Sequence, residues 1–87
     1  NFTGEDFILL TKIINQTEFD YNNIKDFFFF PSERWDIKTK NNVTIKLPIK
    51  DIKYAFIKAQ NIIKSNELNN NNIIDLRIAN RVILLNE

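Results

Sequence analysis

Apolar residues recur at helical spacing in two stretches of the chain. The first, over about residues 6–16, follows a threonine and two acids, as helix starts often do. Its apolar face consists of Phe7, Leu10, Ile13 and Ile14. The second begins at about Lys50, after Pro48, and runs for nearly three turns with Ile52, Ala55, Phe56, Ala59, Ile62 and Ile63 on one face. Both spacings predict helices that each bury one side.

Between these helices the pattern changes to that of strands. Residues 24–30 are β-branched and aromatic without helical phase, and Pro31 ends the run, which predicts a strand that we expect to be covered on both faces. Apolar and polar residues then alternate over 34–40 and again over 43–47. Such alternation is typical of half-buried strands, so a hairpin is expected here.

The two apolar faces of this hairpin agree only if its loop has an odd number of residues. A three-residue loop at 40–42 meets this condition and pairs Ile37 with Ile45. It also requires Asn42 to adopt the left-handed conformation, which asparagine tolerates.

The last quarter of the chain predicts two more strands. Residues 73–78 alternate, with Ile74, Leu76 and Ile78 on one face, and a turn at 79–80 leads to an apolar run at 82–85. The element order is therefore helix, three strands, helix, two strands. It predicts one α+β domain over residues 1–87, in which an antiparallel sheet of about five strands packs against two helices.

The 87-residue chain has no cysteine, no histidine and one glycine, so it lacks the residues on which most catalytic sites depend. Zinc and haem ligation, thiol nucleophiles and glycine-rich phosphate loops are excluded. Ser32 and Ser65 lack an activating base, and Asp36 and Asp75 each lie two residues from an arginine, which favours ion pairs. We therefore expect no enzyme, no metal and no cofactor; a hydrolase would require Asp36 or Asp75 to line a cleft.

The charge is uneven along the chain. The net charge is +1, but residues 34–64 carry eight bases and two acids, a local excess of 8 − 2 = +6. A sheet that binds single-stranded nucleic acid through Lys38 and Lys46 is the alternative reading of this segment. The aromatic residues of the strands fall in phase with apolar residues and the lysines fall opposite, whereas a stacking surface needs both on one face. We expect no nucleic-acid partner.

The carboxyl-terminal run 82–85 contains four consecutive apolar residues and no charge. The pattern leaves two arrangements open, a central core strand or an open edge. Because an uncovered apolar edge pairs readily with other strands, the second arrangement predicts a docking site for an extended peptide. An open edge can also pair with a second copy of this chain.

Several short motifs occur in a recognisable order. Arg34-Trp35-Asp36-Ile37 is followed by Asn41 to Pro48, a helix, Ile74-Asp75-Leu76-Arg77 and a closing strand. This order resembles the carboxyl-terminal β domain of the bacterial cell division protein family FtsQ (DivIB), over about residues 33–85. That family commonly has glycine where this chain has Asn42.

The resemblance implies a non-catalytic scaffold of the divisome on the periplasmic side of the bacterial inner membrane. It implies that this chain is a fragment, without the family's transmembrane helix, POTRA domain and first β-domain strands. From the residues alone we expect no membrane contact by the fragment, because its longest uncharged apolar run, residues 27–30, is far too short to span a bilayer. The implied partners are FtsB-like and FtsL-like (DivIC-like) subunits, the former adding a strand to the final strand. The contact residues carried over are Arg77, Ile78, Arg81, Val82, Ile83 and Leu84.

Overall fold

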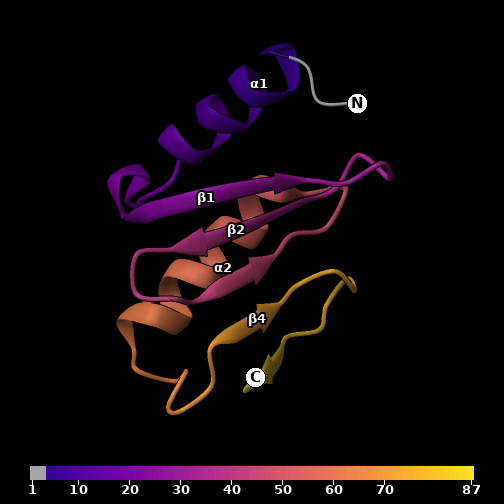
Figure 1. Cartoon of the computed structure of the whole chain (residues 1–87). Helices are drawn as coiled ribbons and strands as arrows, with labels where there is room; N and C mark the ends of the chain where they lie inside the picture. The colour runs from indigo at the N-terminus through magenta and orange to yellow at the C-terminus, as the bar shows by residue number, and fades with distance from the viewer. Residues whose placement is uncertain (1–3) are drawn as a thin grey trace.

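The structure, a computed structural model, describes residues 4–87 and has the predicted element order (Figure 1). The helices are α1 (Gly4–Asn15) and α2 (Ile52–Lys64). The strands are β1 (Ile24–Phe29), β2 (Trp35–Thr39), β3 (Thr44–Lys46), β4 (Ile73–Asp75) and β5 (Ile83–Leu85). A short 3-10 helix, η1 (Tyr21–Asn23), precedes β1 and was not predicted. The α+β class is confirmed.

The five strands form one sheet in the order β1-β2-β3-β4-β5, so strands that are consecutive in the chain are also neighbours in the sheet. All neighbours are antiparallel except β3 and β4, which are parallel. The expectation of a wholly antiparallel sheet was therefore wrong for this pair. The two strands are parallel because α2 connects β3 to β4 and returns the chain to the end of the sheet from which β3 started.

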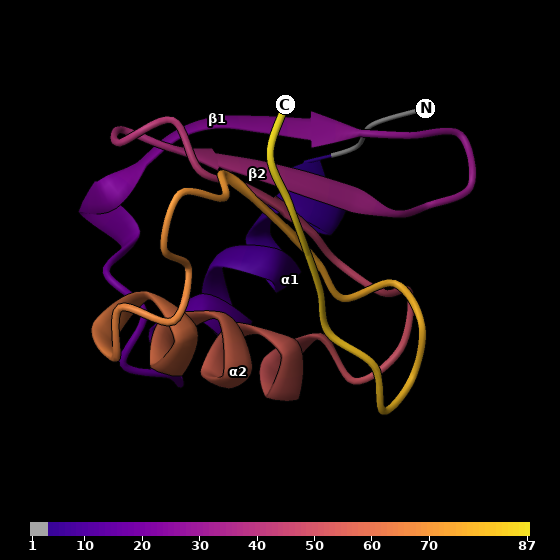
Figure 2. The ribbon, with the colours of Figure 1, turned by 90° about the horizontal axis from the view of Figure 1, so that it is seen from below.

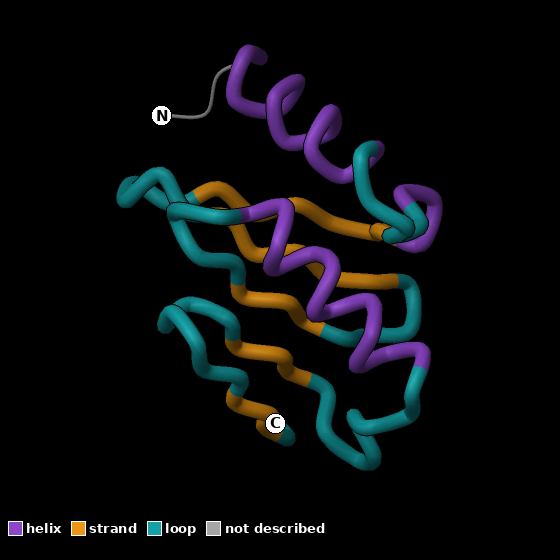
Figure 3. Tube along the Cα trace, turned by 180° about the vertical axis from the view of Figure 1, so that it is seen from behind, coloured by secondary structure: helices purple, strands orange, loops and turns teal. Residues whose placement is uncertain are grey.

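Both helices lie on the same face of the sheet (Figures 2 and 3). Between the sheet and the helices a single core contains Leu10 and Ile14 from α1, Phe56 from α2, and Ile45 and Ile74 from the sheet, all no more than 1% exposed. The opposite face, called the outer face below, carries no helix within residues 4–87. In that range, neither helix has the length and hydropathy that crossing a bilayer requires.

The predicted register of the β2–β3 hairpin is confirmed. Ile37 opposes Ile45, and the backbone N–H of Leu47 donates to the oxygen of Trp35 at 3.1 Å. Asn42 has φ 68°, the left-handed conformation that the three-residue loop requires.

Two expectations about burial were wrong. Strand β1 is not covered on both faces, because it forms an edge of the sheet and Phe28, on the outer face, is 46% exposed. Ile78 does not continue the apolar face of β4: the strand ends at Asp75, and the Ile78 side chain is 53% exposed.

Candidate docking site

Within residues 4–87, β4 is the one neighbour of strand β5 in the sheet, so the other side of β5 is an open edge. The opposite edge, β1, carries the exposed Lys25 and an irregularity in register between Ile24 and Asp26. Charges and bulges of this kind prevent an edge from pairing with other strands. Strand β5 has neither feature, because Ile83, Leu84 and Leu85 are uncharged and pair in regular register.

The hydrogen bonds of β4 determine which residue of β5 faces outward. The N–H of Leu76 donates to the oxygen of Lys46 in β3 at 2.9 Å, so the even-numbered residues of β4 turn their main chain toward β3. The odd-numbered residues then face β5, where Ile83 and Leu85 oppose them. The N–H and C=O of Leu84 therefore point away from β4, to the open side.

The side chains of this edge differ in exposure. Val82, immediately before β5, is 40% exposed, and Leu85 is 43% exposed. Leu84 lies on the inner face and packs against the core, so it anchors the edge strand. An added strand would meet an apolar, ordered edge rather than a loose tail.

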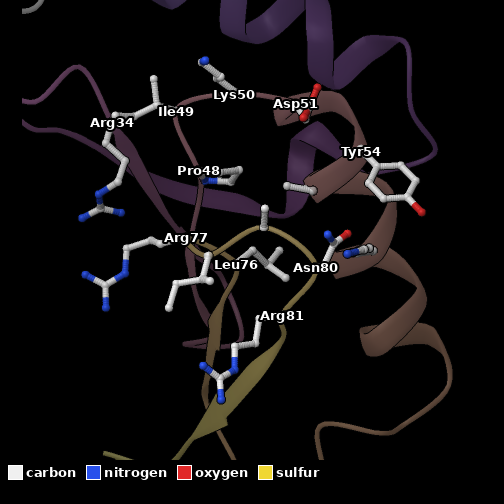
Figure 4. Close-up of a pocket in the computed structure, with 14 residues that line it drawn as sticks. Arg34, Pro48, Ile49, Lys50, Asp51, Tyr54, Leu76, Arg77, Asn80 and Arg81 are labelled. Atoms are coloured by element: carbon white, nitrogen blue, oxygen red, sulfur yellow. The ribbon is translucent and has the colours of Figure 1, made fainter.

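A pocket of about 470 Å³ lies beside this edge (Figure 4). Its walls come from three segments: Arg34 before β2, the β3–α2 connection with the first turns of α2, and the β4–β5 connection. The lining residues are Arg34, Pro48, Ile49, Lys50, Asp51, Tyr54, Ala55, Lys58, Leu76, Arg77, Ile78, Ala79, Asn80 and Arg81. The β4–β5 connection, which supplies Arg81 to the lining, leads from the pocket directly into β5.

Positive charge predominates in the pocket lining, where Asp51 is the one acid. Two of its arginines are held by carboxylates of the outer face: Arg34 is hydrogen-bonded to Asp36, and Arg77 donates to Asp75. The other cations are Lys50, Lys58 and Arg81. Lys58 lies over the ring of Tyr54, with Nζ 5.0 Å from the ring centroid.

Large apolar side chains are also unusually exposed around the pocket. Ile49 is 58% exposed, Tyr54 is 61% exposed and Ile78 is 53% exposed. Figure 4 shows Tyr54 across the pocket from Arg34 and Arg77. Exposed aromatic and aliphatic groups among arginines are the composition of contact surfaces between proteins.

The ion pair of Asp75 and Arg77 fixes the chain where β4 leads into the pocket. Asp75 accepts from the Nε and Nη2 atoms of Arg77 at 2.9 and 2.7 Å and from its backbone N–H at 3.1 Å. These hydrogen bonds lower the pKa of Asp75, the charges of Arg77 and Lys46 add to the effect, and burial opposes it. A lowered carboxyl pKa stabilises the fold above the unfolded-state pKa of about 3.9, and this stability is lost as pH falls through the folded-state value.

Replacing Asp75 with asparagine is expected to lower the free energy of unfolding by about 1–2 kcal/mol at neutral pH. The half-exposed Arg77 keeps this loss modest, because solvent screens the pair. Urea unfolding of both proteins should show the difference shrinking below pH ~4, where the carboxyl group is protonated in the unfolded chain. Asp51→Asn is the matched control, since the exposed Asp51 makes no side-chain capping bond. A difference that persisted at pH ~2 would contradict the assigned role.

Neither Asp36 nor Asp75 lines this pocket, and each forms an ion pair with the arginine two residues away, as their spacing in the sequence favours. Among residues 4–87 no three acidic side chains come close enough to hold a metal ion. Ser65 donates to the oxygen of Ile62 at 3.3 Å, as a helix-end serine does, and Ser32 is exposed in a turn.

The outer face does not offer the continuous basic surface that nucleic acid requires. Along one row of the sheet Lys46 lies between Asp36 and Asp75, and Lys38 lies between Asp26 and Thr44. Phe28 is exposed on this face, which corrects the expectation that the aromatic residues of the strands all belong to the core. It stands opposite Asp36, not opposite a lysine.

The residues carried over from the FtsQ resemblance fall on the two parts of this surface. Arg77, Ile78 and Arg81 line the pocket, Ile83 and Leu84 belong to the edge strand β5, and Val82 immediately precedes it. Sequence reasoning missed the contribution of α2 and the connection before it, namely Ile49, Lys50, Tyr54 and Lys58. Tyr54 was the available signal, because it is an aromatic residue outside the apolar phase of its helix.

No protein-family model matches this chain, and no curated protein matches it either.

Proposed function

We propose that this chain is a non-catalytic docking module that binds an extended segment of another protein by strand addition at β5. The observation that carries the proposal is the open edge, where Leu84 presents its N–H and C=O outward between uncharged neighbours. An added strand gains main-chain hydrogen bonds there, and the side chains beside the edge select its sequence.

The pocket supports a more specific description of the partner. Lys50, Lys58 and Arg81 add positive charge next to the exposed side chains of Ile49 and Ile78. The partner segment that continues from the added strand should therefore carry acidic residues together with one or two large apolar residues. Charge complementarity of this kind speeds association and discriminates among partners.

The biological setting follows from the motif order that resembles FtsQ. On that basis we propose a scaffold role in the bacterial divisome, on the periplasmic side of the inner membrane. FtsB-like and FtsL-like subunits are the proposed partners, and the FtsB-like subunit would supply the strand.

The proposal is tested by titrating the 87-residue chain with the periplasmic region of the FtsB-like protein encoded in the same genome. Leu84→Pro removes the outward N–H and places a ring where the added strand would lie, so we expect about a hundredfold weaker binding. Leu84→Ala is the matched control: it removes the core-facing side chain but keeps the N–H.

Thermal unfolding of both variants separates loss of binding from loss of fold. If Leu84→Pro does not fold, Val82→Pro replaces it, since Val82 lies outside β5 and is exposed. Equal affinities for the proline and alanine variants, or no binding by the unaltered chain, would reject strand addition at β5.

A further inference from the structure

We propose that two copies of this chain pair with each other through β5, in antiparallel orientation about a twofold axis at Leu84. The pairing would close the edge until a partner strand displaces the second copy. The dimer is inferred from the edge alone, whereas its regulatory role rests on the proposed function. The register follows from three properties of residues 81–87.

The first property is the direction of the main chain. In β5 the N–H and C=O of Leu84 point outward, as derived above. Continuing the alternation of the strand by one step at each end would turn the same groups of Val82 and Asn86 outward. With the axis at Leu84, this residue faces Leu84 of the second copy, and Val82 faces Asn86 of the second copy. The outward N–H and C=O groups of each residue then face those of its partner residue in the second copy, as a hydrogen-bonded antiparallel pair requires.

The second property is the match of the two faces. Ile83 and Leu85 point to the outer face and Leu84 to the inner face. The proposed register sets Ile83 opposite Leu85 of the second copy, so aliphatic side chains meet on the outer face. The inner faces also join, because residues that oppose each other in a sheet lie on the same side.

The third property is charge. Arg81 stands opposite Glu87 of the second copy, and symmetry repeats the pair at the other end. Within residues 4–87 neither side chain forms an ion pair, and both are exposed. With the axis at Ile83, Arg81 would face Leu85 of the second copy. With the axis at Leu85, Glu87 would face Ile83 of the second copy, so neither register pairs the two charges. Charge complementarity therefore selects the axis at Leu84.

The shape of the molecule permits this contact. Figure 2 views the chain from the β5 side, and β5 runs across the front with both helices set to one face of the sheet. The backbone N–H of Glu87 donates to the Oδ1 atom of Asn72 at 3.0 Å, which keeps the last residues alongside β4. Residue 87 is therefore tied to the segment that precedes β4, two residues beyond the end of β5. A twofold contact uses this same edge from both copies.

Sedimentation equilibrium over about 10–500 µM tests the dimer without any partner, a range suited to a small interface. Arg81→Glu and Glu87→Arg each place like charges together twice, so each variant should dimerise about tenfold more weakly. The double variant Arg81→Glu/Glu87→Arg restores both attractions and should recover the original constant. An equimolar mixture of the two single variants should form a heterodimer, because their charges are complementary.

Lys25→Glu at the β1 edge is the matched control and should leave dimerisation unchanged. A monomer throughout the concentration range, or single variants that match the unaltered chain, would overturn the pairing, even if the partner binds at β5. Raising the chain concentration through the dimerisation range should weaken the apparent affinity for the FtsB-like region. An affinity independent of dimer content would reject the regulatory role and leave strand addition intact.

Discussion

Replacing Phe56 with alanine is expected to leave much of the chain unfolded at physiological temperature. Phe56 is fully buried and belongs to the core between the helices and the sheet. Its ring meets that of Phe19 edge to face, with centroids 5.2 Å apart. Loss of a buried phenylalanine costs about 3–5 kcal/mol, and domains of this size have about 5–15 kcal/mol of stability in total.

Tyr54→Ala is the matched control, because it removes a ring of similar size from the same helix. Tyr54 is 61% exposed and its ring contacts Lys58, so the expected loss stays below about 1 kcal/mol. Urea unfolding followed by circular dichroism measures both variants. Similar unfolding midpoints for the two variants would mean that the Phe56 side chain does not contribute more to stability than the exposed Tyr54 side chain, which would contradict its assigned place in the core.

The hairpin register could be predicted from the sequence because a shift of one residue would have turned every apolar side chain outward. Ile37 and Ile45 are both fully buried, so this constraint is strong. The parallel direction of β4 could not be read from its pattern, since alternation gives the face of a residue but not the direction of its strand. The intervening helix was the usable clue, because a crossover of that length commonly joins parallel strands.

The exposure of β1 escaped prediction for a different reason. Four consecutive phenylalanines, Phe27 to Phe30, gave no alternation, so the sequence predicted cover on both faces. In the structure Phe27 and Phe29 pack around Trp35, with ring centroids 6.1 and 4.8 Å from it, whereas Phe28 points outward. A uniformly apolar run does not indicate which of its residues face the core.

The candidate site was predictable in part. The edge was predictable only as one of two arrangements, because an uncharged apolar run fits a central strand as well as an open one, and β5 lies at the edge of the sheet. The pocket was not, because its walls come from segments that are distant in sequence, from Arg34 to Arg81. Lys58 of α2 is indistinguishable in sequence from a solvated surface lysine. Its proximity to the β4–β5 connection emerges only when β3 and β4 become neighbours.

Reversing the charge of two pocket lysines is expected to weaken partner binding by about tenfold to a hundredfold without changing dimerisation. The variant is Lys50→Glu/Lys58→Glu, which alters two side chains of the lining and none of residues 81–87. An acidic partner segment would then meet like charges over a partly apolar floor, where repulsion is screened less than at an open surface. Titration with the FtsB-like periplasmic region at low and high salt measures the effect, which should diminish as salt rises.

Lys12→Glu/Lys25→Glu makes the same change in net charge on α1 and β1, outside the pocket, and serves as the control. It should alter affinity little, because long-range attraction to the whole chain is weak at a net charge of +1. Equal effects of the two double variants would show that the partner senses overall charge and does not enter the pocket. An effect confined to the pocket variant, with sedimentation behaviour unchanged, would place the acidic segment of the partner beside the edge to which its strand is added.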